Sequence, residues 1–215
     1  MPDAIIGTSQ AAIDTYEAEA LAIFGRINER MQLLVTQAFA LVYEGPDAET
    51  VFNPGLVTMA VESVSSIDQA MTAFAGVVSA ATSNVSRSLG AGDIEFVYTP
   101  PPLELPPPPG VAADDYRIDV AGFTRFLDVD LVDAQTGITT LLADNQAAFA
   151  AIPYATASTP GWSGASRDHI QNVVVPTQTE RLQHIVDLAL ARVRDFLTQA
   201  RDGSLNADAA GVGVA

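Results

Sequence analysis

Hydrophobic residues recur along the chain with the spacing of amphipathic helices. The first run places apolar residues seven positions apart, and a second seam position is filled by Tyr16 and Ile23. Such a pattern is typical of helices that pack side by side through a narrow apolar seam. It predicts a helix over residues 8–42, with these residues on its seam: Ile13, Ala20, Ile27, Leu34 and Leu41.

A second helix is expected over residues 55–89, after the turn-forming stretch YEGPDAETVFNPG. Gly90 and Gly92 follow its expected end, where a glycine C-cap is common. Its predicted seam consists of Ala60, Val64, Ile67, Met71, Phe74, Val78, Ala81 and Val85.

Two further helices are expected over residues 119–152 and 165–201. Asn145 falls on the seam of the first, where a buried amide typically fixes register at some cost in stability. Pro176 predicts either a kink or a short helical piece before the last helix. The predicted apolar seam positions are Leu127, Leu131, Ala134, Ile138, Leu141, Ala148, Ile152, Leu182, Ile185, Ala189, Val193, Phe196 and Ala200.

Seven prolines in the stretch YTPPPLELPPPPG forbid helix and favour extended polyproline II. We therefore expect a linker here that contributes nothing to the core. The predicted organisation is a helical hairpin over residues 1–95, a proline-rich linker over 96–115, a second hairpin over 116–203 and a flexible tail over 204–215. The expected fold is all-α, with the two hairpins packed as an antiparallel four-helix bundle and no sheet beyond a stray strand near the linker.

The charge balance narrows the classes of partner. The chain of 215 residues has 26 acidic residues against ten arginines and no lysine, so its formal net charge is −16. Such a surface repels nucleic acid phosphates and lacks the basic residues that attract anionic lipid, so neither nucleic acid nor membrane is expected as a partner. No signal peptide and no membrane-spanning run are recognisable.

The two expected hairpin turns align on an aromatic-x-Gly tripeptide. The first turn reads Tyr43-Glu44-Gly45 and the second Trp162-Ser163-Gly164, which holds the only tryptophan. An aromatic ring can fold over the gap between two helices, and a glycine two positions on permits positive φ and close approach. We expect Trp162 to be a packing plug, with recognition of a partner as the second interpretation.

A helical hairpin of about a hundred residues with Trp-x-Gly in its turn resembles the WXG (Esx) family of type VII secretion substrates. On this resemblance the chain is a tandem fusion of two such modules, with Tyr43 replacing the tryptophan in the first. The family's members pair as antiparallel dimers and leave the cell without a signal peptide. The resemblance therefore implies a single-chain pseudo-dimer, secreted or held in the cytoplasm before export, with the secretion machinery or a co-exported protein as partner.

The family's export signal is similar to Tyr-x-x-x-Asp/Glu after a second helix, and a strict match is missing. Tyr98 is followed four residues later by Pro102, while Tyr116 and Asp119 are only three apart. A membrane-active module and a cytoplasmic helical scaffold or chaperone therefore stay open as alternatives.

No grouping of residues indicates catalysis, a cofactor or a metal. His169 and His184 lie near Asp168 and Asp187, but a metal site needs three or four convergent ligands. The acidic run LDVDLVD lacks the glycine and closing glutamate of a calcium loop and fits a helix face. The sequence predicts a non-enzymatic interaction protein.

Overall fold

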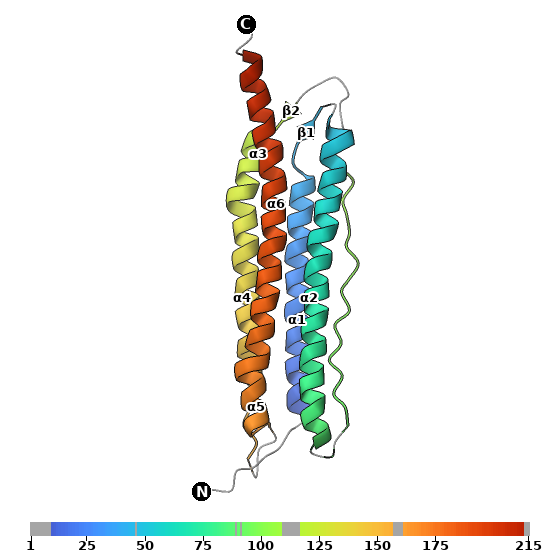
Figure 1. The fold of residues 1–215 in the computed structure, drawn as a ribbon, viewed down its shortest axis with the longest axis vertical. Helices are drawn as coiled ribbons and strands as arrows, with labels where there is room; N and C mark the ends of the chain where they lie inside the picture. Colours follow the sequence, from blue (N-terminus) through green and yellow to red (C-terminus); the bar gives the residue numbers. More distant parts are fainter. Residues whose placement is uncertain are drawn as a thin grey trace. The chain divides into compact units, whose positions relative to one another are not determined.

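The computed structural model describes residues 10–45, 47–88, 90, 92–108, 117–156 and 161–212. Most of these residues are helical and gather in four helical stretches, drawn as coiled ribbons in Figure 1. The prediction of an all-α fold is therefore confirmed.

The first stretch is the single helix α1 (Gln10–Phe39), and the second is η1 (Ala48–Phe52) followed by α2 (Asn53–Ser88). The third joins α3 (Val120–Arg125), η2 (Phe126–Asp130) and α4 (Leu131–Ala150). The fourth joins α5 (Ala165–His169), η3 (Ile170–Val174) and α6 (Val175–Val212). The expected ranges hold to within a few residues except at two ends. The second stretch begins at Ala48, seven residues before the expected start at residue 55, so part of the predicted turn is helical. Residues 204–212, expected in a flexible tail, are also helical.

Among the described residues, three π-helical turns occur in the helical stretches, and two of them stand just before a proline. The turn η1 ends two residues before Pro54, and η3 ends two residues before Pro176. Proline has no N–H to donate four residues back, so the regular hydrogen-bond register cannot continue through it. The short helical piece expected before Pro176 is thus present, as α5 and η3.

The described residues contain one two-stranded sheet, of which one strand lies near the linker as expected. Strands β1 (Tyr43–Glu44) and β2 (Arg117–Ile118) pair antiparallel, with Tyr43 opposite Ile118. The Asp119 N–H donates to the Val42 carbonyl at 3.1 Å, which extends this pairing by one bond.

The chain forms two compact units, and each draws on segments from both sides of the linker. The first unit comprises Met1–Asn28, Ile67–Pro101 and Ile138–Ile185. Its core holds an aromatic cluster in which Tyr16 meets Phe149 edge-on at 5.0 Å and Phe24 meets Phe74 at 5.5 Å, measured between ring centres. These contacts join α1 to both α4 and α2.

The second unit comprises Glu29–Ser66, Pro102–Gly137 and Val186–Ala215. Its core is built around Phe52, whose ring stacks on Tyr43 at 4.3 Å and on Phe196 at 5.6 Å and lies 6.0 Å from Phe123. The second, third and fourth helical stretches and the first turn therefore meet at this side chain.

The expectation that the linker contributes nothing to the core is wrong. Residues 92–108, here called the strap, run extended beside α2 in Figure 1. Ile94, Phe96 and Tyr98 are all nearly inaccessible to solvent, whereas Val97 between them is 64% exposed. This alternation is that of an extended chain with one face buried, so the strap adds a layer of side chains to the first unit.

The strap also explains where the predicted seam of α2 fails. Ala81 and Val85, expected in the seam, are only half-buried, whereas Thr82, Ser83 and Ser86 are buried. Ser83 and Ser86 donate hydrogen bonds to the strap carbonyls of Ile94 and Gly92. A heptad pattern scores hydroxyl side chains as polar, so it cannot anticipate a backbone partner that satisfies them.

Candidate functional site

The Trp162 turn, in the first unit, is closed by complete burial of the indole. Trp162 is 0% exposed, and its ring meets Phe149 of α4 edge-on at 5.9 Å. Its N–H groups are satisfied, because the backbone amide donates to the Pro153 carbonyl at 2.9 Å and the indole Nε1 donates to Ser166 Oγ at 3.3 Å. The placement matches the packing plug expected from the sequence.

A buried arginine also stabilises the Trp162 turn. Arg167 of α5 is 1% exposed, and its Nη2 donates to the carbonyls of Ile152 at 2.7 Å and Ala150 at 3.3 Å. Its guanidinium carbon lies 3.7 Å from the centre of the Tyr154 ring. A cation at the carboxyl end of α4 satisfies orphan carbonyls and complements the helix dipole. Sequence reasoning missed Arg167, since a burial pattern rarely assigns arginine to a core.

The Tyr43 turn, in the second unit, is closed in a different way. Tyr43 is half-buried, and its ring stacks on Phe52 with an angle of 14° between the planes. Its backbone pairs with Ile118 in the β1–β2 ladder. The sequence predicted a stray strand but not its partner, because the pairing joins residues on opposite sides of the linker.

The two turns share one backbone feature. Gly45 has φ = 144° and Gly164 has φ = 107°, both in the region that side chains rarely adopt. Each glycine carbonyl accepts a hydrogen bond from the first turn of the next helical stretch, from Ala48 N–H at 2.9 Å and from Asp168 N–H at 3.2 Å. The positive φ expected for both glycines is present.

Asn145 occupies the core position that the seam predicted. It is 0% exposed, and neither its amide oxygen nor its nitrogen has a hydrogen-bond partner in the described part of the chain. The buried Tyr16 hydroxyl likewise has no hydrogen-bond partner among the described residues. Burial raises the pKa of Tyr16, and the nearby Asn145 amide partly opposes that rise. This polar pair therefore carries a desolvation penalty in the centre of the first unit.

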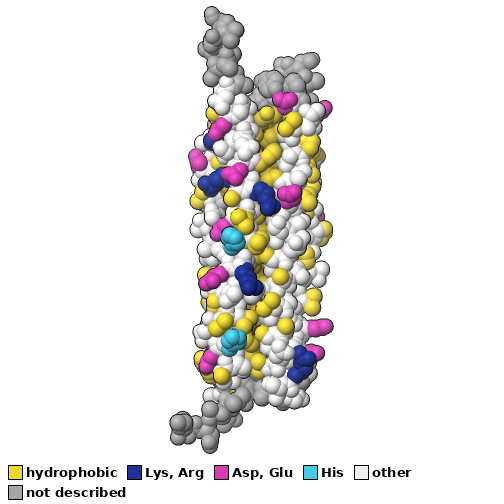
Figure 2. Space-filling model, viewed as in Figure 1, with side chains coloured by type: hydrophobic (Ala, Val, Ile, Leu, Met, Phe, Trp, Pro, Cys, Tyr) yellow, Lys and Arg dark blue, Asp and Glu magenta, His cyan; other side chains and the backbone are white. Residues whose placement is uncertain are grey.

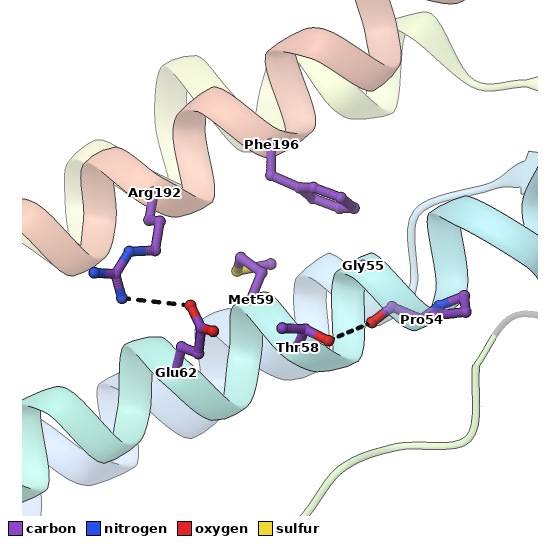
Figure 3. Close-up of a pocket in the computed structure, with 7 residues that line it drawn as sticks. All are labelled: Pro54, Gly55, Thr58, Met59, Glu62, Arg192 and Phe196. Carbon is purple, nitrogen blue, oxygen red and sulfur yellow. Dashed lines mark hydrogen bonds and ion pairs between the residues drawn. The ribbon is translucent and has the colours of Figure 1, made fainter.

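A shallow groove of about 370 Å³ lies between α2 and α6 in the second unit. Figure 3 shows Phe196 reaching from α6 toward Gly55 and Met59 of α2. A side chain at Gly55 would meet the Phe196 ring, since an ideal Cβ there would lie 2.6 Å from Cε2. One edge carries the exposed ion pair between Glu62 and Arg192, at 3.8 Å. The groove can offer a partner apolar contact next to this ion pair.

A second groove, of about 430 Å³, lies between α1 and α4 in the first unit. Four alanines and Ile23 line it, together with three charged residues, Glu19, Arg26 and Asp144. Neither groove gathers a nucleophile, a base and an orienting group of the kind that catalysis requires.

Among the described residues, no three histidines, cysteines or acids gather closely enough to hold a metal ion. His169 of α5 and His184 of α6 are both exposed. Asp187 instead accepts a hydrogen bond from Gln135 Nε2 at 3.0 Å. Acidic and basic side chains are scattered over the face shown in Figure 2, with hydrophobic side chains exposed between them.

The described helices include none with the length and apolar character required to cross a bilayer. No family model matches the chain, and neither the curated proteins nor the solved structures include a match to it.

Proposed function

We propose that the chain is a non-enzymatic helical interaction protein, similar to the exported substrates of type VII systems and built as a single-chain counterpart of an Esx dimer. The observation that carries this proposal is the pair of aromatic-x-Gly turns. In each, a positive-φ glycine leads into a long helical stretch and an aromatic ring packs against a phenylalanine.

In the proposed arrangement, the two hairpins pack as an antiparallel four-helix bundle. Two contacts in the second unit support it: Gly55 of α2 lies against Phe196 of α6, and Ser63 Oγ, further along α2, donates to the carbonyl of Ala189, earlier in α6. The helices therefore run in opposite directions at this interface. Such packing through apolar seams is the usual geometry of a four-helix bundle.

The linker replaces dimer formation in this proposal. Joining two modules in one chain fixes their ratio and gives the second docking event a high effective concentration. We therefore expect a monomer whose mass by light scattering is independent of protein concentration. A mass that doubles with concentration would instead indicate hairpins exchanged between two chains.

Export is tested by expressing the tagged chain in a host with an active type VII system and in the same host lacking the system's ATPase. The proposal expects the chain in the medium of the first host only, with a cytoplasmic marker retained in both. The Trp162→Phe variant, which keeps an apolar ring at the turn, serves as the matched control for any Trp162→Ala defect. Retention of the native chain in both hosts would contradict the proposal.

A cytoplasmic helical scaffold is the second candidate, and the position of Tyr98 favours it. Tyr98, the first possible start of an export motif, is 6% exposed and its hydroxyl accepts a hydrogen bond from Asn28. It anchors the strap, so it is not displayed for a receptor, and Pro102 stands where the acidic residue of the motif belongs. Tyr116 lies outside the described residues. If the native chain is exported, a Tyr98→Phe variant that is still exported would show that the Tyr98 hydroxyl anchors the strap and is not part of an export signal.

A further inference from the structure

The first part of the strap, up to Pro101, belongs to the first unit, where side chains of α2 hold its backbone by hydrogen bonds. Ser83 Oγ pairs with both backbone groups of Ile94, at 2.8 Å each. Ser79 Oγ donates to the Ile94 carbonyl at 2.7 Å and accepts from Phe96 N–H at 3.2 Å. These contacts fix the strap's register on α2 while Ile94 and Phe96 bury their side chains.

Two residues further along, a polar cluster meets the strap at Tyr98. The Asn28 amide of α1 donates to the Tyr98 hydroxyl, and both residues are buried. Asp68 of α2 lies in the same cluster and is half-buried. Its Oδ1 is inaccessible to solvent and has no hydrogen-bond partner among the described residues. A carboxylate oxygen in this position is costly while it carries charge.

We propose that Asp68, in the polar cluster with Tyr98, makes docking of the strap depend on pH, so that lowering the pH tightens the strap on α1 and α2 and raising the pH loosens it. When the strap lifts away, water reaches the carboxylate and removes its desolvation penalty. Ionised Asp68 therefore favours the open strap, whereas neutral Asp68 favours the docked one.

The direction in which burial moves the pKa of Asp68 supports this pH dependence. Burial raises the pKa of Asp68 above its ordinary value of 3.8, and the nearby Asn28 amide opposes the rise only in part. Because undocking would restore an ordinary pKa, the docked state binds the proton more tightly. Docking gains strength as the pH falls through the raised pKa toward 3.8, and loses it as the pH rises through the same window.

The groups that act on Asp68 come from the two elements packed against it. Asn28 faces it from α1, and the Tyr98 phenol faces it from the strap, where burial and the charge of Asp68 raise the pKa of the phenol. No arginine in the described part of the chain forms an ion pair with Asp68. Glu17 also titrates in the first unit, with its charge interaction to Asp14 on the same helix, so a test must separate the two.

Hydrogen exchange of the full chain tests the proposal directly, because the Ile94 and Phe96 amides donate to the α2 serines. Protection is measured by NMR from below pH 3.8 to pH 8, which covers the whole window above the ordinary pKa of Asp68, and corrected for the intrinsic dependence of exchange on pH. We expect these two amides to lose protection as pH rises, by roughly tenfold for each unit by which undocking lowers the pKa of Asp68. The Asp119 amide, which bonds to Val42 in the second unit, serves as the reference amide.

The matched variants assign the effect to one carboxylate. Asp68→Asn should flatten the pH profile of both strap amides. Asp93→Asn, which removes an exposed carboxylate of the strap that pairs with Arg87, and Glu17→Gln should keep the profile. A slope retained in Asp68→Asn would overturn the proposal, as would flat strap protection in the native chain.

A second measurement on the native chain keeps the proposal testable if Asp68→Asn does not fold. Carboxyl carbon NMR follows Asp68 directly, and its midpoint should coincide with the midpoint of strap protection. A midpoint of Asp68 near 3.8, or one distinct from that of the strap amides, would overturn it.

Discussion

The Trp162 turn and the Tyr43 turn both connect two helical stretches, but different contacts stabilise them. Both reverse the chain with a positive-φ glycine that opens a helical stretch. The Trp162 turn is closed locally, by the buried indole and by Arg167 against the carbonyls that end α4. The Tyr43 turn is closed by β2, a segment far away in sequence.

The difference follows from what each turn must cover. Eleven residues separate the end of α4 from Trp162, whereas three separate α1 from Tyr43. The longer connection leaves apolar surface that a large ring can cover and carbonyl groups that a buried cation can pair with. The aligned position of Arg167 in the first turn is Ala48, which is also buried. The glycine is thus the shared element, and the residues around it depend on the space to be filled.

The largest expected effect is that of Trp162→Ala. Removing a fully buried indole should lower the free energy of unfolding by about 3–5 kcal/mol, measured by urea denaturation. Trp162→Phe should cost clearly less, because it keeps a ring against Phe149. The native tryptophan emission should be blue-shifted and should move to the red on unfolding. Emission typical of a solvated indole in the folded chain would contradict the plug.

Arg167→Ala should have the next largest effect, about 2–3 kcal/mol, because it leaves the buried carbonyl of Ile152 and the part-buried carbonyl of Ala150 without this donor. Arg194→Ala, at an exposed arginine of α6, is the matched control and should change the stability by less than about 0.5 kcal/mol. Equal losses in the two variants would show that Arg167 acts only through the net charge.

The glycines test the feature that the two turns share. Gly164→Ala and Gly45→Ala should each lower the free energy of unfolding by about 1–3 kcal/mol, since φ near 107° or 144° is strained for any side chain. Gly25→Ala is the control, because it lies inside α1, where an added Cβ would meet open space, and it should be neutral or stabilising. A loss at only one turn would break the proposed equivalence.

Much of the helical fold was predictable because the spacing of apolar residues along a helix determines which of its residues are buried. Residues such as Ile13, Ile27 and Ile67 are buried where the heptad pattern placed them. The turn glycines were predictable for a similar reason, since their conformation is a local property. Glycine marks some helix ends, such as Gly90 just after α2, but Pro54 and Pro176 lie within helical stretches and do not mark where those stretches begin.

The features that the sequence missed depend on contacts between distant segments. Ser83 reads as a polar interruption until the strap supplies Ile94 as its partner. Likewise, Arg167 reads as a surface residue until the end of α4 supplies its carbonyls. The strap was assigned to solvent because its prolines exclude helix, but extended chain can bury alternate side chains. A one-dimensional pattern contains no information about which segments meet.

A smaller effect is expected at the first turn. Tyr43→Ala should cost about 1–2 kcal/mol, less than Trp162→Ala, because its ring is only half-buried. Tyr43→Phe should be nearly neutral, since the stacking on Phe52 is kept.

Tyr43→Trp tests the resemblance between the two turns. If the space around Tyr43 resembles that around Trp162, the variant should fold with stability close to native. A loss as large as that of Tyr43→Ala would show that the β-closed turn cannot hold an indole.

The smallest effect separates the turns by pH. Glu17 lies in the unit that holds the Trp162 turn, and burial, reinforced by Asp14, raises its pKa from 4.5 to about 7. The folded state therefore binds the proton more tightly, so the contribution of Glu17 to stability is full below pH 4.5 and is lost as pH rises through about 7. Solvent screening of this half-exposed group limits the loss to about 1 kcal/mol.

Urea denaturation followed by Trp162 fluorescence at pH 5 and pH 8 should detect this loss. The measurement is made in an Asp68→Asn background, which removes the strap's own titration. Glu17→Gln should abolish the difference, whereas Glu49→Gln, an exposed carboxylate near the Tyr43 turn, should leave it unchanged. Persistence of the difference in Glu17→Gln would assign the pH dependence to another group.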